Sequence, residues 1–322
     1  QRPPTNGFGV PERHYRRPGQ LRTRSDRLLV ARKEVELPYV LNGININSEY
    51  LTDRVKSVDV RCALMEPTAR SLSRTYSDRV YPDPWENVLD YRRVREYAAE
   101  HPNAGRVRVG RALDLPAGRV RGWLKDAVPD PVRGINAAID HGWLDPDPDS
   151  ETAAALVELL AHVLAGGSIA TKNYVPAVTP GERVNTEEIH AAFDRVGVET
   201  RTRNADTPGR ATEIVPTCDG TVLGRCLVAM GAPTGVKTTL DHLPAVVWDV
   251  PRPVRRSFAR VYVRHRGLNY AGKSTTRVQV ERPTSFIAEL QDVLDDVLTE
   301  RVTTADAGLT ISADAARELG VE

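Results

Sequence analysis

The spacing of apolar residues alternates between helical and strand periods in a regular order over the second half of the chain. From residue 153 onward this pattern predicts a helix, a strand, a helix, two strands and a helix. The predicted helices and strands cover 153–165, 168–178, 186–196, 198–203, 211–216 and 221–230. A further helix is predicted after residue 253. This order of elements is typical of an α+β fold.

A group of short helices is predicted ahead of this region. Three helical segments and one turn follow one another at 91–100, 107–113, 115–118 (the turn) and 119–124. A short helix, a turn with glycine and a following helix form the layout of helix-turn-helix DNA-binding domains. We therefore expect a three-helix DNA-binding domain over 85–145, with Arg119 and Arg121 at the start of its recognition helix. The alternative is a three-helix unit with a purely structural role.

Charge is distributed unevenly along the chain, although the formal net charge is only +1. Residues 91–125 hold 9 Lys and Arg against 3 Asp and Glu, whereas residues 281–322 hold 3 against 10. A concentration of basic residues indicates a polyanionic partner, and the acidic C-terminal segment is a candidate surface for a protein partner. Residues 1–30 are rich in Arg, Pro and Gly and predict a disordered basic arm. Residues 31–84 are left unassigned.

Composition and cysteine spacing limit the class of protein. Hydrophobic residues make up 40% and charged residues 27% of the chain, which is typical of globular proteins in water. No apolar run approaches the ~20 residues that cross a bilayer. The three cysteines, Cys62, Cys218 and Cys226, lack the spacing of zinc ligands. We expect a cytoplasmic protein with reduced thiols, no membrane segment and no cofactor.

Two stretches, 159–169 and 258–268, consist mainly of small and apolar residues and pass through a glycine near their ends. Both resemble the LAGLIDADG motif of homing endonucleases. The resemblance implies that the two motif helices pack side by side and that the acid near the end of each holds a divalent metal ion. Here these acid positions align with Gly166 and Arg266, which cannot ligate Mg²⁺. The expected active site is therefore degenerate, with no catalytic residue and no metal ligand.

The segment 231–237 resembles the Gly-x-Pro-x-Gly-x-Lys link that joins the two halves of many homing endonucleases. The shared order of elements extends over 153–300. It implies a two-half αββαββα saddle at 150–322, formed within one chain, with halves at about 150–231 and 232–322. Sporulation regulators of the WhiA type combine a helix-turn-helix and such a saddle in the other order, and the whole chain resembles them.

In this family the strands of the saddle lie over the duplex, and their basic and polar side chains contact phosphates and bases. The candidate DNA-binding residues are Arg106, Arg108, Arg119, Arg121, Lys172, Arg201, Arg203, Arg264, Arg266, Lys273, Arg277 and Gln279. Two of them, Arg264 and Arg266, would place positive charge where active members hold their metal ions. The alternative for each single residue is a solvated strand or helix surface.

Other chemistry has little support in the sequence. His162 and His265 are candidates for a two-histidine metal site, but a lone histidine on such a helix is more often a packing or surface residue. The run 271–275 contains Gly-Lys-Ser but lacks the earlier glycine of a phosphate-binding loop. Neither feature predicts an enzyme.

The leading interpretation is a non-catalytic regulator that binds double-stranded DNA. One alternative is an active or decaying homing endonuclease that makes Mg²⁺-dependent double-strand breaks. Another is a protein-interaction module on the same scaffold. Neither the DNA target nor the oligomeric state follows from the sequence.

Overall fold

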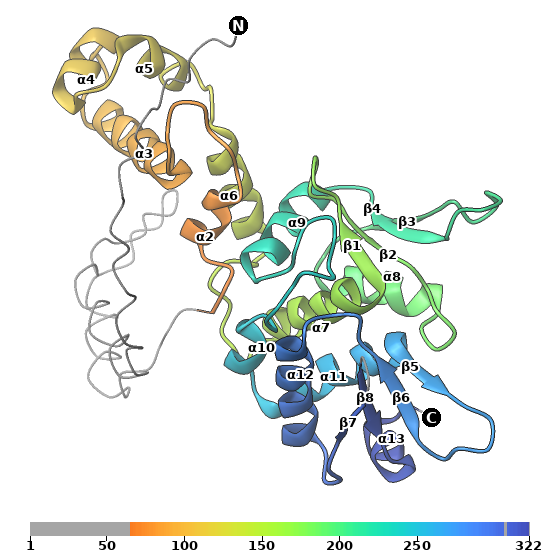
Figure 1. Cartoon of the computed structure of the whole chain (residues 1–322). Coiled ribbons are helices and arrows are strands. Elements are labelled where there is room, and N and C mark those ends of the chain that lie inside the picture. Colours follow the sequence, from red (N-terminus) through yellow and green to blue (C-terminus); the bar gives the residue numbers. More distant parts are fainter. Residues whose placement is uncertain (1–64, 306–307, 322) are drawn as a thin grey trace, which may run out of the picture. The chain divides into compact units, whose positions relative to one another are not determined.

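The computed structural model describes residues 65–305 and 308–321 (Figure 1). The basic arm expected at 1–30 lies outside the described residues, and so does the unassigned segment 31–84 up to residue 64. The described chain combines helices with two small antiparallel sheets. The prediction of an α+β fold is therefore confirmed. None of the described helices is long and apolar enough to cross a membrane.

The described part of the chain begins with five helices that precede α7: α2 (Ala69–Arg74), α3 (Pro84–Glu100), α4 (Arg106–Leu113), α5 (Ala117–Trp123) and α6 (Asp130–Asp140). The prediction for α3 was wrong at its start, which lies at Pro84 instead of residue 91. Asp83 accepts a hydrogen bond from the backbone amide of Trp85 and Pro84 occupies the first turn, which together begin a helix.

Helices α3, α4 and α5 share a small apolar core of their own. Its buried members are Val94, Ala104, Val109, Val120 and Trp123. The ring of Tyr91 packs edge-on against Trp123, with the ring centroids 5.8 Å apart. This core holds the three helices together independently of the sheets.

A first run of seven elements follows in the order αββαββα: α7 (Glu151–Gly166), β1 (Gly167–Ile169), β2 (Pro176–Val178), α8 (Thr186–Arg195), β3 (Thr200–Arg203), β4 (Glu213–Pro216) and α9 (Gly220–Ala229). The sheet has the order β1-β2-β4-β3. The single strand expected at 168–178 is in fact a hairpin, because the backbone reverses at Tyr174, whose φ is 58°. The remaining elements agree with the predicted ones to within a few residues.

A second run repeats the same order after the short helix α10 (Val246–Asp249): α11 (Arg252–Arg266), β5 (Gly267–Asn269), β6 (Thr276–Gln279), α12 (Thr284–Val297), β7 (Thr303–Ala305), β8 (Gly308–Ile311) and α13 (Ala313–Leu319). Its sheet has the order β5-β6-β8-β7, which is the order of the first sheet. The two runs are therefore copies of one topology (Figure 1).

Helices α7 and α11 pack against each other at the centre of the two copies. Nearly every residue of α7 from Ala153 to Ala165 is buried, as expected for a helix with apolar residues on all sides. Small side chains such as Ala161 and Ala259 are fully buried in these helices and allow a close approach. Helices α7 and α11 thus form the core of the part of the chain that holds the two sheets.

The N-terminal helices are tied to the first copy by polar contacts. The guanidinium of Arg225 on α9 lies between the rings of Tyr76 and Tyr174, 3.9 and 3.7 Å from their centroids. The indole of Trp143, after α6, donates a hydrogen bond of 2.9 Å to the carbonyl of Val196. Cation–π and buried hydrogen-bond contacts of this kind fix a particular packing of neighbouring elements.

Candidate nucleic-acid interface

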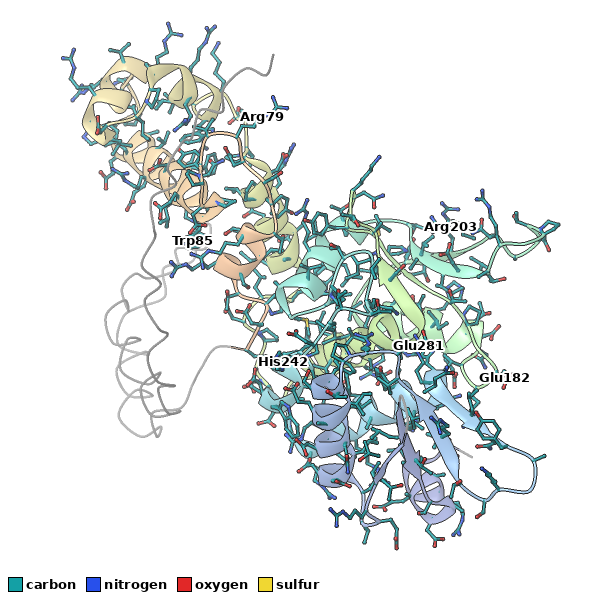
Figure 2. All side chains as sticks on the ribbon, in the orientation of Figure 1. Arg79, Trp85, Glu182, Arg203, His242 and Glu281 are labelled. Carbon is teal, nitrogen blue, oxygen red and sulfur yellow. The ribbon has the colours of Figure 1, made fainter. Side chains whose placement is uncertain are left out.

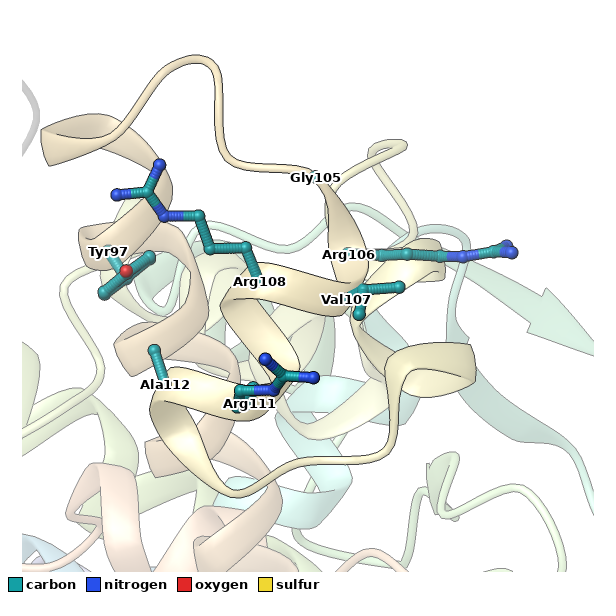
Figure 3. A pocket seen from close by; sticks show the side chains of 7 residues that line it. All are labelled: Tyr97, Gly105, Arg106, Val107, Arg108, Arg111 and Ala112. Carbon is teal, nitrogen blue, oxygen red and sulfur yellow. The ribbon is translucent and has the colours of Figure 1, made fainter.

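A hollow of about 620 Å³ runs along the exposed side of α4 (Figure 3). Three arginines, Arg106, Arg108 and Arg111, line it together with Tyr97 and Val107. All three arginines are exposed, and none has a hydrogen bond or ion pair among the described residues. Figure 3 shows Arg106 and Arg108 extending from the helix in different directions. The hollow therefore offers unneutralised positive charge to an external ligand.

The connection from α4 to α5 is a tight turn. Asp114 has the left-handed backbone conformation, with φ 56°, and the amide of Leu115 donates a hydrogen bond of 2.8 Å to the carbonyl of Gly110. A Cβ at Gly110 would lie 2.6 Å from the carbonyl oxygen of Leu115, so this close approach needs glycine. The expected turn at 115–118 is corrected to 114–116, because Ala117 already belongs to α5.

The two arginines expected at the start of the recognition helix differ in their surroundings. Arg119 is half-buried; its Nη1 donates a hydrogen bond of 2.7 Å to the Tyr81 hydroxyl, and its guanidinium lies 4.6 Å from the Tyr81 ring centroid. Tyr81 in turn donates to Asp90, and burial together with this carboxylate raises the Tyr81 pKa to about 12. Arg119 therefore stabilises the segment before α3. Arg121 is exposed and has no partner in the described chain.

The first motif acid position carries a glycine because a histidine side chain fills the space beside it. A Cβ on Gly166 would lie 2.2 Å from Nδ1 of His265. His265 comes from the second motif helix, and its Nε2 lies 2.9 Å from Nδ1 of His162 on the first. An acid at this position would collide with the His265 ring. The two motif helices therefore meet through a histidine pair at this point.

Both histidines of the pair are neutral near pH 7. Burial lowers the His162 pKa to about 4, and burial followed by repulsion from His162 and Arg266 lowers the His265 pKa to about 3. Since their facing nitrogens share one hydrogen bond, these nitrogens are not both available to one metal ion. Within 65–305 and 308–321, no group of three His, Cys, Asp or Glu side chains could hold a metal.

The second motif acid position, Arg266, lies at the end of α11 and is half-buried. Its neighbour Arg264 does not face open solvent: Nη1 forms an ion pair of 2.6 Å with Glu188, and Nη2 donates to the carbonyl of Arg183. Arg264 thus fastens α11 to α8. Sequence reasoning missed Lys237 and Arg282, which lie near Arg266. Lys237 is the final residue of the glycine-rich link 231–237 and could have been noticed there.

The candidates on the first sheet are divided between free and paired side chains. Arg201 is exposed on strand β3 without a partner among the described residues. Arg203, which is labelled in Figure 2, forms an ion pair of 2.7 Å with Glu213. Lys172 is exposed in the turn between β1 and β2. Part of the positive charge on this sheet is thus neutralised by a carboxylate of the same sheet.

The candidates on the second sheet lie on strand β6 and in the turn before it. Arg277 pairs across the sheet with Leu268 and Thr310, on the face opposite the buried Val278. Gln279 follows on the same face, because alternate strand residues share a face. Lys273 lies in the turn with its Nζ 5.8 Å from the Tyr270 ring centroid. Since 271–275 connects two strands and opens no helix, it is not a phosphate-binding loop.

No protein-family model matches the chain, and no curated protein matches it either.

Proposed function

We propose that the protein is a cytoplasmic regulator that binds double-stranded DNA without cleaving it. In this proposal α3, α4 and α5 form a helix-turn-helix, and the two αββαββα copies form a LAGLIDADG-type saddle within one chain. The repeated order of elements, the packing of α7 against α11 and the tight turn between α4 and α5 support this assignment.

The observation that carries the proposal is a set of exposed cations without partners on α4, on α5 and just after it. In the described chain these are Arg106, Arg108, Arg111, Arg121 and Lys125. Elsewhere many arginines are bound to carboxylates, as in Arg195–Glu158 at 2.7 Å. A duplex carries one negative charge per about 1.7 Å of its axis, so it is a matching partner for such a surface.

Two glycines on α5 add a second argument. A Cβ at Gly118 would meet no atom within 4 Å, and one at Gly122 would meet only the Cβ of Ala127 at 3.6 Å. Glycine inside a helix costs about 1 kcal/mol relative to alanine, and nothing in the folded chain requires it at these positions. A bare helix surface beside Arg121 lets a DNA backbone or base edge approach closely.

We expect the triple variant Arg106→Ala, Arg108→Ala, Arg111→Ala to bind DNA more weakly and with a shallower salt dependence. Each lost phosphate contact should lower the slope of log K against log salt by about 0.9. Fluorescence anisotropy with a labelled mixed-sequence duplex at several KCl concentrations measures both quantities.

Arg133→Ala is the matched control, because Arg133 is an exposed arginine on α6 that pairs with its neighbour Asp130. It should leave the slope unchanged. An unchanged slope in the triple variant would remove α4 from the interface. Absence of duplex binding by the full chain would overturn the proposal and favour a protein-interaction role.

The acidic C-terminal segment gives that alternative limited support, because several of its acids already have partners. Glu289 accepts from His242 at 2.7 Å, and Asp296 pairs with Arg255 at 2.9 Å. Glu318 accepts from the amide of Thr299 at 2.9 Å. These acids hold the second copy together, and fewer remain for another protein.

We expect no cleavage of supercoiled plasmid with Mg²⁺ or Mn²⁺, because neither motif position supplies a carboxylate. An agarose-gel nicking assay on purified full-length protein measures this. The converse variant needs Gly166→Asp and Arg266→Asp together with His265→Ala, since the His265 ring occupies the space beside residue 166. Metal-dependent cleavage by the wild-type chain would show that the endonuclease alternative is right.

A further inference from the structure

Positive side chains converge where α7 and α11 end and strands β1 and β5 begin. The Nζ of Lys237 lies 3.1 Å from the carbonyl oxygens of both Val163 and Leu164 and also donates to Gly167. The Nη2 of Arg282 donates a hydrogen bond of 2.7 Å to the same Leu164 carbonyl. Arg266, the last residue of α11, completes the group.

The charges of this group are not balanced by nearby acids. Among the described residues, none of the three cations forms an ion pair with a carboxylate, and Glu188 on α8 is already paired with Arg264. The ends of α7 and α11 together supply the equivalent of about one negative charge. About two positive charges therefore remain uncompensated.

The surroundings also show that grouping these three cations is energetically unfavourable. Burial, followed by repulsion from Arg266 and Arg282, lowers the Lys237 pKa to about 8. Arg282 is half-buried beside the Tyr262 side chain, with its guanidinium 4.5 Å from the Phe286 ring centroid, and burial lowers its pKa as well. A bound anion would offset the repulsion among these cations.

We infer that Lys237, Arg266 and Arg282 form an anion site that holds a phosphate group between the two αββαββα copies. The assignment of that phosphate to a DNA backbone rests on the proposed function. In this arrangement fixed cations take the position at which the LAGLIDADG resemblance would place metal ions. DNA binding should then be independent of divalent metal.

Lys237 and Arg282 also bind carbonyl groups at the end of α7, so helix capping alone could explain those two residues. Arg266 separates the explanations, because it makes no hydrogen bond or ion pair within the described chain. A charge without an internal role is expected to matter only if an anion is bound. Arg266→Gln is therefore the informative variant.

Arg260→Gln is the matched control, because Arg260 is exposed on the same helix. Its substitution removes the same charge at a position away from the site. In EDTA, Arg266→Gln should bind a labelled duplex about tenfold more weakly, with a salt slope lower by about one, while the control should match wild type. In a thermal-shift assay at constant ionic strength, inorganic phosphate should raise the melting temperature of wild type more than that of Arg266→Gln.

The two measurements separate the possible outcomes. If both variants equal wild type in DNA binding and phosphate stabilises all three proteins alike, the cations only cap α7 and the inference is overturned. If phosphate acts through Arg266 but the salt slope does not change, the anion site stands and its assignment to DNA is wrong. If the wild-type chain binds no duplex, the proposed function fails, while the phosphate arm still tests the site.

Discussion

Lowering the pH from 6.5 to 4 is expected to cost the fold about 3 kcal/mol through His162 alone. Its pKa in the folded protein is about 4, against an ordinary value of 6.5. Above pH 6.5 the ring is neutral in both states, so pH has no effect through it. Below pH 6.5 the unfolded chain takes up a proton that the folded chain excludes, and stability falls until the folded ring also protonates near pH 4.

The hydrogen bond between His162 and His265 adds to this effect. One of the two facing nitrogens must be unprotonated to accept the hydrogen bond. The bond therefore survives protonation of one ring but not of both. The packing of α7 against α11 is therefore the part of the molecule that should fail first in acid. Urea unfolding followed by circular dichroism at several pH values measures the free energy of unfolding.

The double variant His162→Asn, His265→Gln provides the comparison, because amides can keep the hydrogen bond but do not titrate. Its stability should fall less than that of wild type between pH 6.5 and 4. His242→Gln is the control, since His242 is exposed and the hydrogen bond with Glu289 raises its pKa. Equal losses in wild type and the double variant would show that the pair does not cause the acid sensitivity.

Two glycine-to-alanine changes less than ten residues apart are expected to have opposite effects on stability. Gly110→Ala places a Cβ 2.6 Å from the backbone oxygen of Leu115 and should destabilise the fold by about 1–3 kcal/mol. Gly118→Ala meets open space and should stabilise the helix by up to about 1 kcal/mol. Urea unfolding of the full chain at pH 7 measures both changes.

DNA binding should weaken in both variants, but for different reasons. In Gly110→Ala the turn that positions α5 is distorted, whereas in Gly118→Ala a methyl group covers a surface that faces the duplex in the proposed complex. A more stable Gly118→Ala protein with unchanged affinity would mean that this face of α5 does not contact DNA.

The order of elements could be predicted from the sequence because each helix or strand is encoded by local periodicity. The helix from 153 to 165 was predicted within two residues of α7, since its apolar residues continue without a break. The hairpin within 168–178 was missed because its reversal depends on Tyr174, a residue type that rarely adopts positive φ. Short strands next to such a turn have little pattern of their own.

The candidate site could be predicted less well because its contacts join distant parts of the chain. The sequence offers His162 and His265 as a two-histidine metal site or as packing residues, whereas the packing of the two helices joins them by a hydrogen bond. Arg119 was predicted to face DNA, but Tyr81 lies 38 positions earlier and binds it. Lys237 reaches back to Val163 in the same way. Sequence spacing does not show such partners.

The two copies of the αββαββα run share a topology but not their surface chemistry. The edge strand β3 of the first sheet carries Arg201 and Arg203, whereas the corresponding edge strand β7 of the second carries Thr303 and Thr304. If both sheets lie on one duplex, the two half-sites that they contact will differ in sequence. The bound protein would then have a direction along the DNA. Inverting the site would reverse that direction.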